Sequence, residues 1–401
     1  MNHMNDPQSK VAHSTNCAAG WVATVAATFL LCAPASAQSP KRGAVMSLDP
    51  HGPTTAVLQK LVTDTSVLRD WGANLVRFSL IHPGVVLDDP IATDPDEYLA
   101  WLDGQLDQIE YVTAPNLAIF GQGRMQILIN LQHPPGGFYS SGPHSGEMRL
   151  FYEQDWESAY LSAIRTIATR CQAWASGPNP MAIWGVDLLN EPAVKLDAEG
   201  RAKWRALAGR AAARVKKYAP NATVVIEPLW GRPDEMAPKL FRPVSSDPTI
   251  HYGPHFFNPV QFTHQGVTDS AAPPQHPIGP IYPGCTFGGI TYDRAALEST
   301  LGPTVAFASR YQKPIFIGEW TASRVAPNQS AFEWMKDVAT IIDERGWSST
   351  YHGFRDSWWW DVEFDENPAS TQPAGYETSR ERLIRSWFQR NIDSRLDLAE
   401  E

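Results

Sequence analysis

Short apolar runs alternate with amphipathic segments along most of this chain. The runs are continuous and rich in β-branched residues, as in parallel strands that are buried on both faces. They predict eight strands, at residues 43–47, 74–80, 125–131, 183–189, 223–227, 250–256, 314–319 and 351–359.

The segments between these runs carry apolar residues at helical spacing. We expect helices within residues 57–71, 99–112, 155–174, 199–218, 295–311, 330–345 and 378–391. Eight strands alternating with helices predict an α/β fold, a (β/α)₈ TIM barrel with long loops at its C-terminal face. An open doubly wound sheet is the alternative, but no glycine-rich phosphate loop follows the first strand.

The N-terminus has the pattern of a secretory signal. Lys10 precedes an apolar run at 17–33, and Ala35-Ser36-Ala37 provides the small residues that a signal peptidase recognises. We expect residues 1–37 to be removed and 38–401 to form one catalytic barrel, secreted or periplasmic. A membrane anchor is the alternative, although the run is short for a span. Leu31 is too large for a lipoprotein signal at Cys32.

Composition narrows the possible partners. Apolar residues make up 43% of the chain and charged residues 19%, which supports a large packed core. The net charge of −10, with no cluster of Lys or Arg, argues against a nucleic-acid partner. After signal cleavage we expect a monomer that does not associate with a membrane. Cys171 and Cys285 remain, and only geometry decides whether they pair.

Polar residues gather where the predicted strands end, which is where barrel enzymes carry their chemistry. They are Arg77, His133, Asn190, Glu191, Glu227, His255, Glu319 and the tryptophans 358–360. A strand-end glutamate could form a structural ion pair or cap a helix. Two facing carboxylates could instead cleave an acetal, one as the acid and the other as the nucleophile. The residues alone do not separate Glu227 from Glu191.

The chain resembles glycoside hydrolase family 5, the cellulase family of the clan A (β/α)₈ hydrolases, over about residues 43–390. LLNEP (188–192) is similar to the family's Asn-Glu-Pro at the end of the fourth strand. IFIGEW (315–320) is similar to its Gly-Glu-aromatic at the end of the seventh. The resemblance implies that Glu191 is the acid/base and Glu319 the nucleophile, with retention of configuration. Glu227 then has a structural or supporting role.

Weaker matches extend the resemblance to the substrate-binding residues. Arg77, His133 and His255 look like the family's polar residues on strands two, three and six, and Asn190 is implied to bind a sugar 2-hydroxyl. Trp359 is favoured as the eighth-strand tryptophan, and Trp320 is a candidate wall for sugar stacking. The loop histidines 82, 144, 264 and 276 are expected to be solvated.

One position departs from the family pattern. The sixth strand of the family usually carries His-x-Tyr, whose hydroxyl hydrogen-bonds the nucleophile, whereas this chain has Phe257. Tyr252 could supply a hydroxyl only if the strand followed a different path. FTHQG (262–266) is similar to a segment of some bacterial cellulase-like members, which favours an unusual subfamily.

The resemblance implies a secreted retaining hydrolase of β-linked glucan, cellulase-like, with a β-glycan as its partner. A β-mannanase, an exo-β-glucanase and a β-glycosidase of the same family are alternatives, as is a non-catalytic glycan-binding barrel. We expect no cofactor and no metal, because no closely spaced His/Asp set such as HExxH is present.

Overall fold

The computed structural model describes residues 39–83, 94–116, 120, 125–268 and 274–397. The predicted signal segment, residues 1–37, lies outside the described residues. From Ser39 onward the chain forms one compact unit. Among the residues that the structure describes, none of the helices combines the length and the apolar character needed to cross a membrane.

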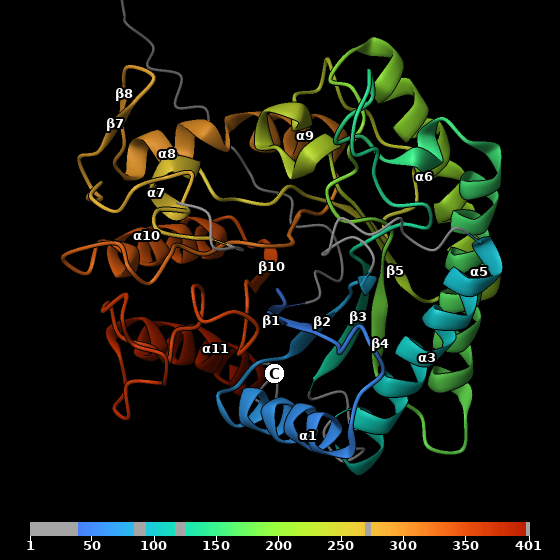
Figure 1. Ribbon diagram of the computed structural model, residues 1–401, viewed down its shortest axis with the longest axis horizontal. Coiled ribbons are helices and arrows are strands. Elements are labelled where there is room, and N and C mark those ends of the chain that lie inside the picture. The colour runs from blue at the N-terminus through green and yellow to red at the C-terminus, as the bar shows by residue number, and fades with distance from the viewer. Residues whose placement is uncertain (1–38, 84–93, 117–119, 121–124, 269–273, 398–401) are drawn as a thin grey trace, which may run out of the picture. The chain divides into compact units, whose positions relative to one another are not determined.

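Eight parallel strands form the barrel, and they follow one another around it in chain order (Figure 1). They are β1 (Arg42–Ser47), β2 (Leu75–Leu80), β3 (Gln126–Leu131), β4 (Ile183–Asp187), β5 (Thr223–Ile226), β6 (Ile250–Tyr252), β9 (Phe316–Ile317) and β10 (Ser348–Tyr351). Between β6 and β9 the barrel is closed by two parallel bridges, Tyr252 to Ile315 and Phe256 to Trp320. The predicted (β/α)₈ barrel is therefore confirmed.

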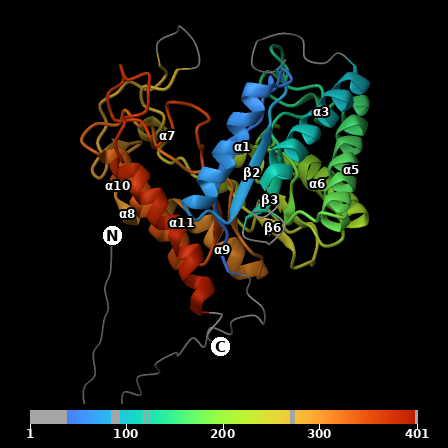
Figure 2. The same ribbon diagram turned by 90° about the horizontal axis from the view of Figure 1, so that it is seen from below.

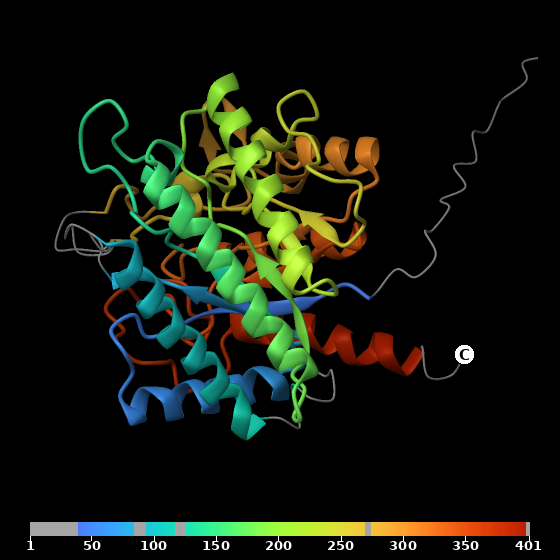
Figure 3. The same ribbon diagram turned by 90° about the vertical axis from the view of Figure 1, so that its right-hand side faces the viewer.

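Helices cover the outside of the strands (Figure 2). They are α1 (Thr55–Asp70), α3 (Pro95–Thr113), α5 (Gln154–Ser176), α6 (Ala198–Tyr218), α8 (Arg294–Thr300), α9 (Gly302–Tyr311), α10 (Ser330–Glu344) and α11 (Ser379–Asp397). Figure 3 shows α1, α3, α5 and α6, coloured blue through green, lying across the strands of the first half.

Side-chain caps mark where several helices begin. Thr54, Asp94, Asp197 and Asp293 each accept a hydrogen bond from a backbone N–H in the first turn of the helix that follows. These bonds satisfy donors that a helix leaves free at its start. The predicted helix at 295–311 is two helices, α8 and α9, which meet at Leu301 with Gly302 and Pro303 after it.

The apolar core has two parts. The larger part lies between strands and helices and includes Trp71, Trp174, Trp204 and Trp387. A smaller cluster joins one residue from each of five strands: Leu75, Leu128, Trp184, Val225 and Phe316. Residues from five strands can meet only inside the barrel, so this cluster closes its interior.

The predicted eighth strand is wrong in its position. It was expected at 351–359, but β10 ends at Tyr351 and the three tryptophans 358–360 lie beyond it in a turn. The aromatic run suggested a strand, yet Ser348–Tyr351 pairs with β1 and β9. Cys171 and Cys285 are free, so the possible disulfide does not form.

A short helix and a small hairpin lie between β6 and α8. The helix α7 (Val260–Thr263) follows β6, and the strands β7 (Thr286–Phe287) and β8 (Ile290–Thr291) form a small antiparallel hairpin. They belong to the long 257–293 loop that the sequence placed at the C-terminal face.

Candidate active site

The polar site lies next to the apolar cluster inside the barrel, two residues further along the strands. Side chains two residues apart on a strand share a face, so Arg77 follows Leu75 on β2 and Glu227 follows Val225 at the end of β5. Both are buried, with exposures of 0% and 1%. The apolar cluster closes the barrel below, and the polar groups above it are shielded from solvent.

Arg77 is the centre of this site and contacts three carboxylates. Its Nη1 donates to Glu319 Oε1 at 2.7 Å, its Nη2 to Glu227 Oε1 at 2.9 Å, and its Nε to Asp187 Oδ2 at 3.0 Å. Nη2 also donates to Asn190 Oδ1 at 3.0 Å. Burial opposes the charge, but the three carboxylates outweigh it and raise the pKa of Arg77. A buried guanidinium needs such partners to remain in the core.

His255 links the carboxylates at the ends of β4, β5 and β9. Its Nδ1 lies 2.8 Å from Glu191 Oε1 and 3.6 Å from Glu319 Oε2, and its Nε2 lies 3.0 Å from Glu227 Oε1. Burial would lower the pKa of His255, but the charges of Glu227 and Glu319 raise it well above its ordinary value. The ring is therefore an imidazolium at neutral pH, and both nitrogens donate.

Glu319 is held in its ionised form. Burial would raise its pKa, but His255, His352 and Arg77 together lower it to about 2. The carboxylate follows Gly318, where a Cβ would lie 2.8 Å from His255 Nε2, so a larger residue would displace the imidazolium. A buried carboxylate that stays charged at neutral pH is suited to act as a nucleophile.

Glu191 differs from Glu319 in both exposure and backbone. Its side chain is 39% exposed, so it can exchange protons with solvent. Its φ of 42° is unusual for a residue with a side chain, and its N–H donates to Glu227 Oε2 at 2.8 Å. Gly231 lies against it, and a Cβ there would come within 2.8 Å of Glu191 Oε1. Strain of this kind is common where function requires a fixed geometry.

Glu227 has a positioning role in this geometry. Its Oε1 accepts from Arg77 and His255, and its Oε2 accepts from the backbone of Glu191. With both oxygens occupied and almost no exposure, it holds the other groups in place and offers no free oxygen to a substrate. This contact pattern separates the two glutamates that the sequence left equivalent.

The remaining predicted residues do not all reach the site. Asn190 is bonded to Arg77. His133 is half-buried, and its Nδ1 lies 3.2 Å from the carbonyl of His82; burial lowers the pKa of His133 to about 4. His82 itself is buried against Tyr98 and Trp101, so the expectation that it is solvated is wrong.

The two tryptophan predictions need correction. Trp320 is fully buried and packs on Trp387 with ring centres 5.1 Å apart, so its ring is not available to stack on a sugar. Trp320 belongs to the core between strands and helices and not to the cluster inside the barrel. Trp359 stacks on Trp358 at 3.8 Å, donates to the Thr268 carbonyl and is 7% exposed, so little of its ring is open to a sugar.

Two residues of the site were missed from the sequence. Asp187 is a charged residue inside the apolar run IWGVDLL, a signal that could have indicated a buried ion pair with Arg77. Burial and the charge of Glu227 raise its pKa well above the ordinary value, although Arg77 opposes this. His352 follows β10 directly, and its Nδ1 lies 3.3 Å from Glu319 Oε2. The sequence prediction put the end of the eighth strand at residue 359, so His352 was not recognised as a strand-end residue.

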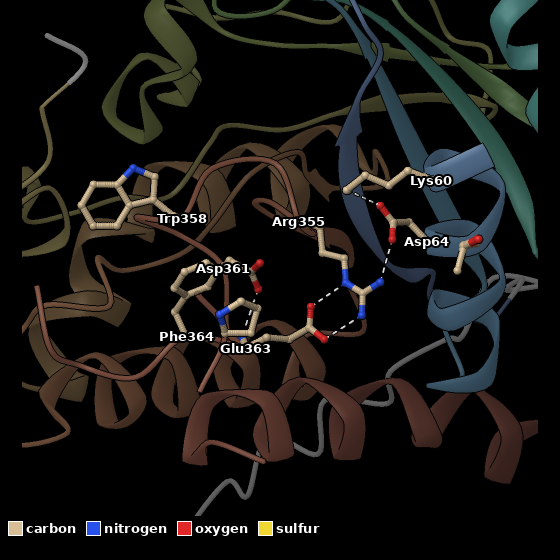
Figure 4. A pocket seen from close by; sticks show the side chains of 9 residues that line it. Lys60, Asp64, Arg355, Trp358, Asp361, Glu363 and Phe364 are labelled. Atoms are coloured by element: carbon tan, nitrogen blue, oxygen red, sulfur yellow. Dashed lines mark hydrogen bonds and ion pairs between the residues drawn. The ribbon is translucent and has the colours of Figure 1, made fainter. Parts of the chain in front are cut away.

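A separate polar pocket lies between α1 and the segment that follows β10 (Figure 4). It has a volume of about 590 Å³. Arg355 pairs there with Asp64 and Glu363, and Lys60 pairs with Asp64. These four charges balance one another, and Asp361, whose pKa burial raises to about 6, also lines the pocket. No group of three or more His, Cys, Asp or Glu side chains in the described segments is arranged to hold a metal ion.

Comparisons with known proteins agree with the barrel and give its family. Residues 53–356 match the family described as Cellulase (glycosyl hydrolase family 5). Cellodextrinase A of Ruminococcus flavefaciens is 20% identical over 286 residues, covering 71% of this chain and 75% of that protein. Endoglucanase C of Acetivibrio thermocellus is 21% identical over 300 residues, covering 70% and 80%.

A solved structure gives the same fold. Thermotoga maritima Cel5A in complex with a mannotriose substrate has a TM-score of 0.59 and 18% identity, and the match covers 86% of this chain and 97% of that one. At this identity the likeness concerns the arrangement of strands and helices.

Proposed function

The chain belongs to the cellulase family, glycosyl hydrolase family 5, and we propose that it hydrolyses internal β-1,4 linkages of a glucan with retention of configuration. Membership of this family makes the protein a glycosidase. The substrate, the endo mode of action and the two-glutamate mechanism are the proposal. The observation that carries it is the meeting of Glu191 and Glu319 at one imidazolium, that of His255.

The spacing of the two glutamates supports retention. Glu191 Oε1 and Glu319 Oε2 lie 2.8 and 3.6 Å from the same nitrogen, His255 Nδ1. The two oxygens are therefore no farther apart than the sum of these distances. That limit concerns one pair of oxygens, and it is compatible with retention but does not by itself exclude the roughly 6.5–9.5 Å between carboxyl groups in inverting glycosidases, which must admit a water between them. A retaining enzyme has its nucleophile closer, at about 5–5.5 Å.

In the proposed first step, one oxygen of Glu319 attacks the anomeric carbon as the bond from that carbon to the leaving oxygen breaks. Glu191 gives its proton to the leaving oxygen, which departs as a hydroxyl. In the second step a water attacks the same carbon, and Glu191 takes the water's proton. The bond to Glu319 breaks, the carboxylate is restored, and the sugar leaves with its original configuration.

The polar groups around the glutamates have separate tasks in this proposal. Arg77 keeps Glu319 ionised through its hydrogen bond to Oε1. Because a guanidinium stays charged, Arg77 does not take part in the proton transfers. Because Arg77 donates to Asn190 Oδ1, the amide is oriented with its Nδ2 free to donate. We assign that amide to the sugar 2-hydroxyl, and His133 to the rim of the same subsite.

A mannan is the second candidate substrate. It is favoured by the similar Thermotoga maritima Cel5A structure, which holds mannotriose. Glucan and mannan differ in the orientation of one hydroxyl, the 2-hydroxyl that Asn190 is proposed to contact. A hydrolysis screen on β-1,4-glucan, β-1,3-glucan, mannan and small aryl β-glycosides distinguishes these substrates. Soluble fragments of mixed length from β-1,4-glucan support endo action, whereas release of one product from chain ends supports exo action.

The roles of the two glutamates are tested with azide as an external nucleophile. On an activated aryl β-glycoside, Glu319→Ala with azide should give the α-glycosyl azide, because azide takes the nucleophile's place. Glu191→Ala with azide should give the β-glycosyl azide, because Glu319 still forms the first intermediate. Exchange of these two products would reverse the roles. Binding of glucan by the native protein without any release of reducing ends would favour a glycan-binding barrel instead.

We also propose that residues 1–37 direct export and are then removed. The support is the sequence pattern of Lys10, the 17–33 run and the small residues before Gln38. The mass of the exported protein should correspond to a chain starting at Gln38. An exported protein that still contains residues 17–33 would favour the alternative, in which this segment anchors the protein in a membrane.

A further inference from the structure

The nucleophile in this chain lacks the hydroxyl that usually accompanies it in similar proteins. Phe257 stands where the family resemblance expects a tyrosine. Tyr252 does not replace it, because its hydroxyl accepts from Val244 N at 3.0 Å and its ring packs against Phe241 and Phe307. A donor to the second oxygen of Glu319 must come from elsewhere.

His352 lies nearest to that oxygen. Glu319 Oε1 accepts from Arg77, and Oε2 lies 3.3 Å from His352 Nδ1 and 3.6 Å from His255 Nδ1. The nitrogen of His255 is also engaged by Glu191 Oε1 at 2.8 Å. His352 is therefore the closer of the two histidines and is not drawn toward the other glutamate.

The position of His352 is fixed by its neighbours. Its backbone N–H donates to the carbonyl of Trp320, the residue after Glu319, at 3.2 Å. Its ring meets Phe257 edge-on at 6.0 Å and Trp360 at 6.2 Å. The phenyl ring that replaces the expected tyrosine thus forms part of the pocket that holds the imidazole.

His352 Nδ1 makes an ion-pair contact with Glu319 Oε2 and has no hydrogen-bond partner among the described residues. We propose that His352 is the positioning residue of the nucleophile, with this Nδ1 turning to donate to Glu319 Oε2 in the role that a sixth-strand tyrosine hydroxyl fills in similar proteins. This rests on the proposed function, in which Glu319 is the nucleophile. It differs from a tyrosine in one respect: the charge that His352 can carry lowers the pKa of Glu319. The other titratable groups that act electrostatically with His352 are Asp356 and His264.

The test compares His352→Ala, His352→Gln and His352→Ala combined with Phe257→Tyr. An activated 2-deoxy-2-fluoro β-cellobioside measures the rate at which the nucleophile is labelled, and mass spectrometry identifies the labelled residue. His352→Ala should lower both kcat/KM and the labelling rate by about 10²-fold, the effect of removing one oriented donor. Adding Phe257→Tyr should restore at least about tenfold, since the new hydroxyl lies beside the vacated imidazole.

The pH profile separates the charge from the hydrogen bond. Loss of a positive neighbour raises the pKa of Glu319, so the acid limb of kcat/KM should move up by about 1 pH unit. The shift should occur in all three variants, because Ala, Gln and Tyr are uncharged, while His352→Gln keeps a donor and should lose less rate. His51→Ala, at an exposed histidine, is the control for histidine replacement and should leave both readouts unchanged.

The outcomes distinguish the two proposals. If His352→Ala labels Glu319 at the native rate with an unmoved acid limb, His352 has no positioning role and the proposed function stands. If another residue is labelled in the native protein, the proposed function fails first. Should His352→Ala not fold, as judged by thermal unfolding, His352→Gln carries the test, and an unmoved acid limb in that variant overturns the proposal.

Discussion

Glu319 and Asp361 are buried to the same extent, with 5% exposure each, yet their pKa values move in opposite directions. The pKa of Glu319 falls to about 2, and that of Asp361 rises to about 6. Glu319 lies in the site around Arg77, whereas Asp361 lines the pocket around Arg355.

The difference comes from the neighbours. Burial raises the pKa of both groups. Around Glu319, side-chain nitrogens of Arg77, His255 and His352 all lie within 3.6 Å, and these three groups together lower its pKa more than burial raises it. Asp361 accepts a backbone hydrogen bond from Glu363 N, but the Glu363 carboxylate opposes it. Burial alone therefore does not decide whether a carboxylate stays ionised; the positive groups around it do.

The largest expected effect separates the two carboxylates by activity. Glu319→Gln should lower kcat on an aryl β-glycoside by about 10⁴-fold or more, because the nucleophile is lost. Asp361→Asn is the matched change in the other region. It should keep kcat within about threefold, because Asp361 lines the other pocket and can affect the reaction at Glu319 only indirectly. Near-native turnover by Glu319→Gln on every β-glycan that the protein cleaves would contradict the assignment.

The next effect concerns the two arginines. Arg77→Lys should destabilise the fold by about 3–5 kcal/mol, because one ammonium cannot satisfy three buried carboxylates. Arg355→Lys should cost about 1 kcal/mol or less, because its ion pairs are partly open to solvent. Urea unfolding at neutral pH measures both. Equal losses in the two variants would remove the distinction between the regions.

The opposite pKa shifts predict opposite pH dependences of stability. The ionised form of Glu319 stabilises the fold above its ordinary pKa of 4.5, and this contribution is lost as the pH falls toward about 2. Asp361 favours the protonated form in the fold, so its contribution is present below its ordinary pKa of 3.8 and is lost as the pH rises toward about 6.

The pH dependence of stability due to each carboxylate should disappear when that carboxylate is replaced. The expected change across either window is about 2–3 kcal/mol. Urea unfolding from pH 2.5 to 8 should show a flatter acid side in Glu319→Gln and a flatter pH 4–6 region in Asp361→Asn. The comparison fails if Asp361→Asn instead alters the acid side.

The smallest expected effect tests the correction at Trp320. Its ring packs against Trp387 and Tyr351, and its Nε1 has no hydrogen-bond partner among the described residues. Trp320→Phe should therefore leave KM for glucan oligosaccharides within about twofold and lower stability by about 1–2 kcal/mol through lost packing. A tenfold rise in KM with an unchanged kcat would return Trp320 to the sugar-binding surface.

Most of the fold could be predicted because its signal is local. Continuous apolar runs such as 125–131 and helical spacing in segments such as 155–174 follow from the burial of strands and helix faces. The prediction failed at β10, because its sequence SSTY lacks an apolar run. The aromatic residues 358–360 favour a longer strand, so its predicted end lies eight residues beyond the observed one. Strands β6 and β9 are also shorter than predicted, because single bridges complete the closure.

The site was predictable where the family motifs carry it. Asn190-Glu191-Pro192 and Gly318-Glu319 indicated the two glutamates, and the polar residues Arg77, within β2, and His255, after β6, were predicted to join them. The structure placed all four within one hydrogen-bonded group. Asp187 and His352 were missed, since neither forms a motif with its sequence neighbours.

The sequence by itself determined the barrel, the two glutamates and the absence of a tyrosine at Phe257, because these depend on periodicity and on residue identity. Only the tertiary structure decided that Glu227 supports Glu191, that Trp320 faces the helices, and that His352 reaches Glu319. These facts depend on contacts between residues far apart in the chain, such as Arg77 with Glu319, 242 residues away. Their electrostatic consequences depend on distance and burial, which a linear pattern does not contain.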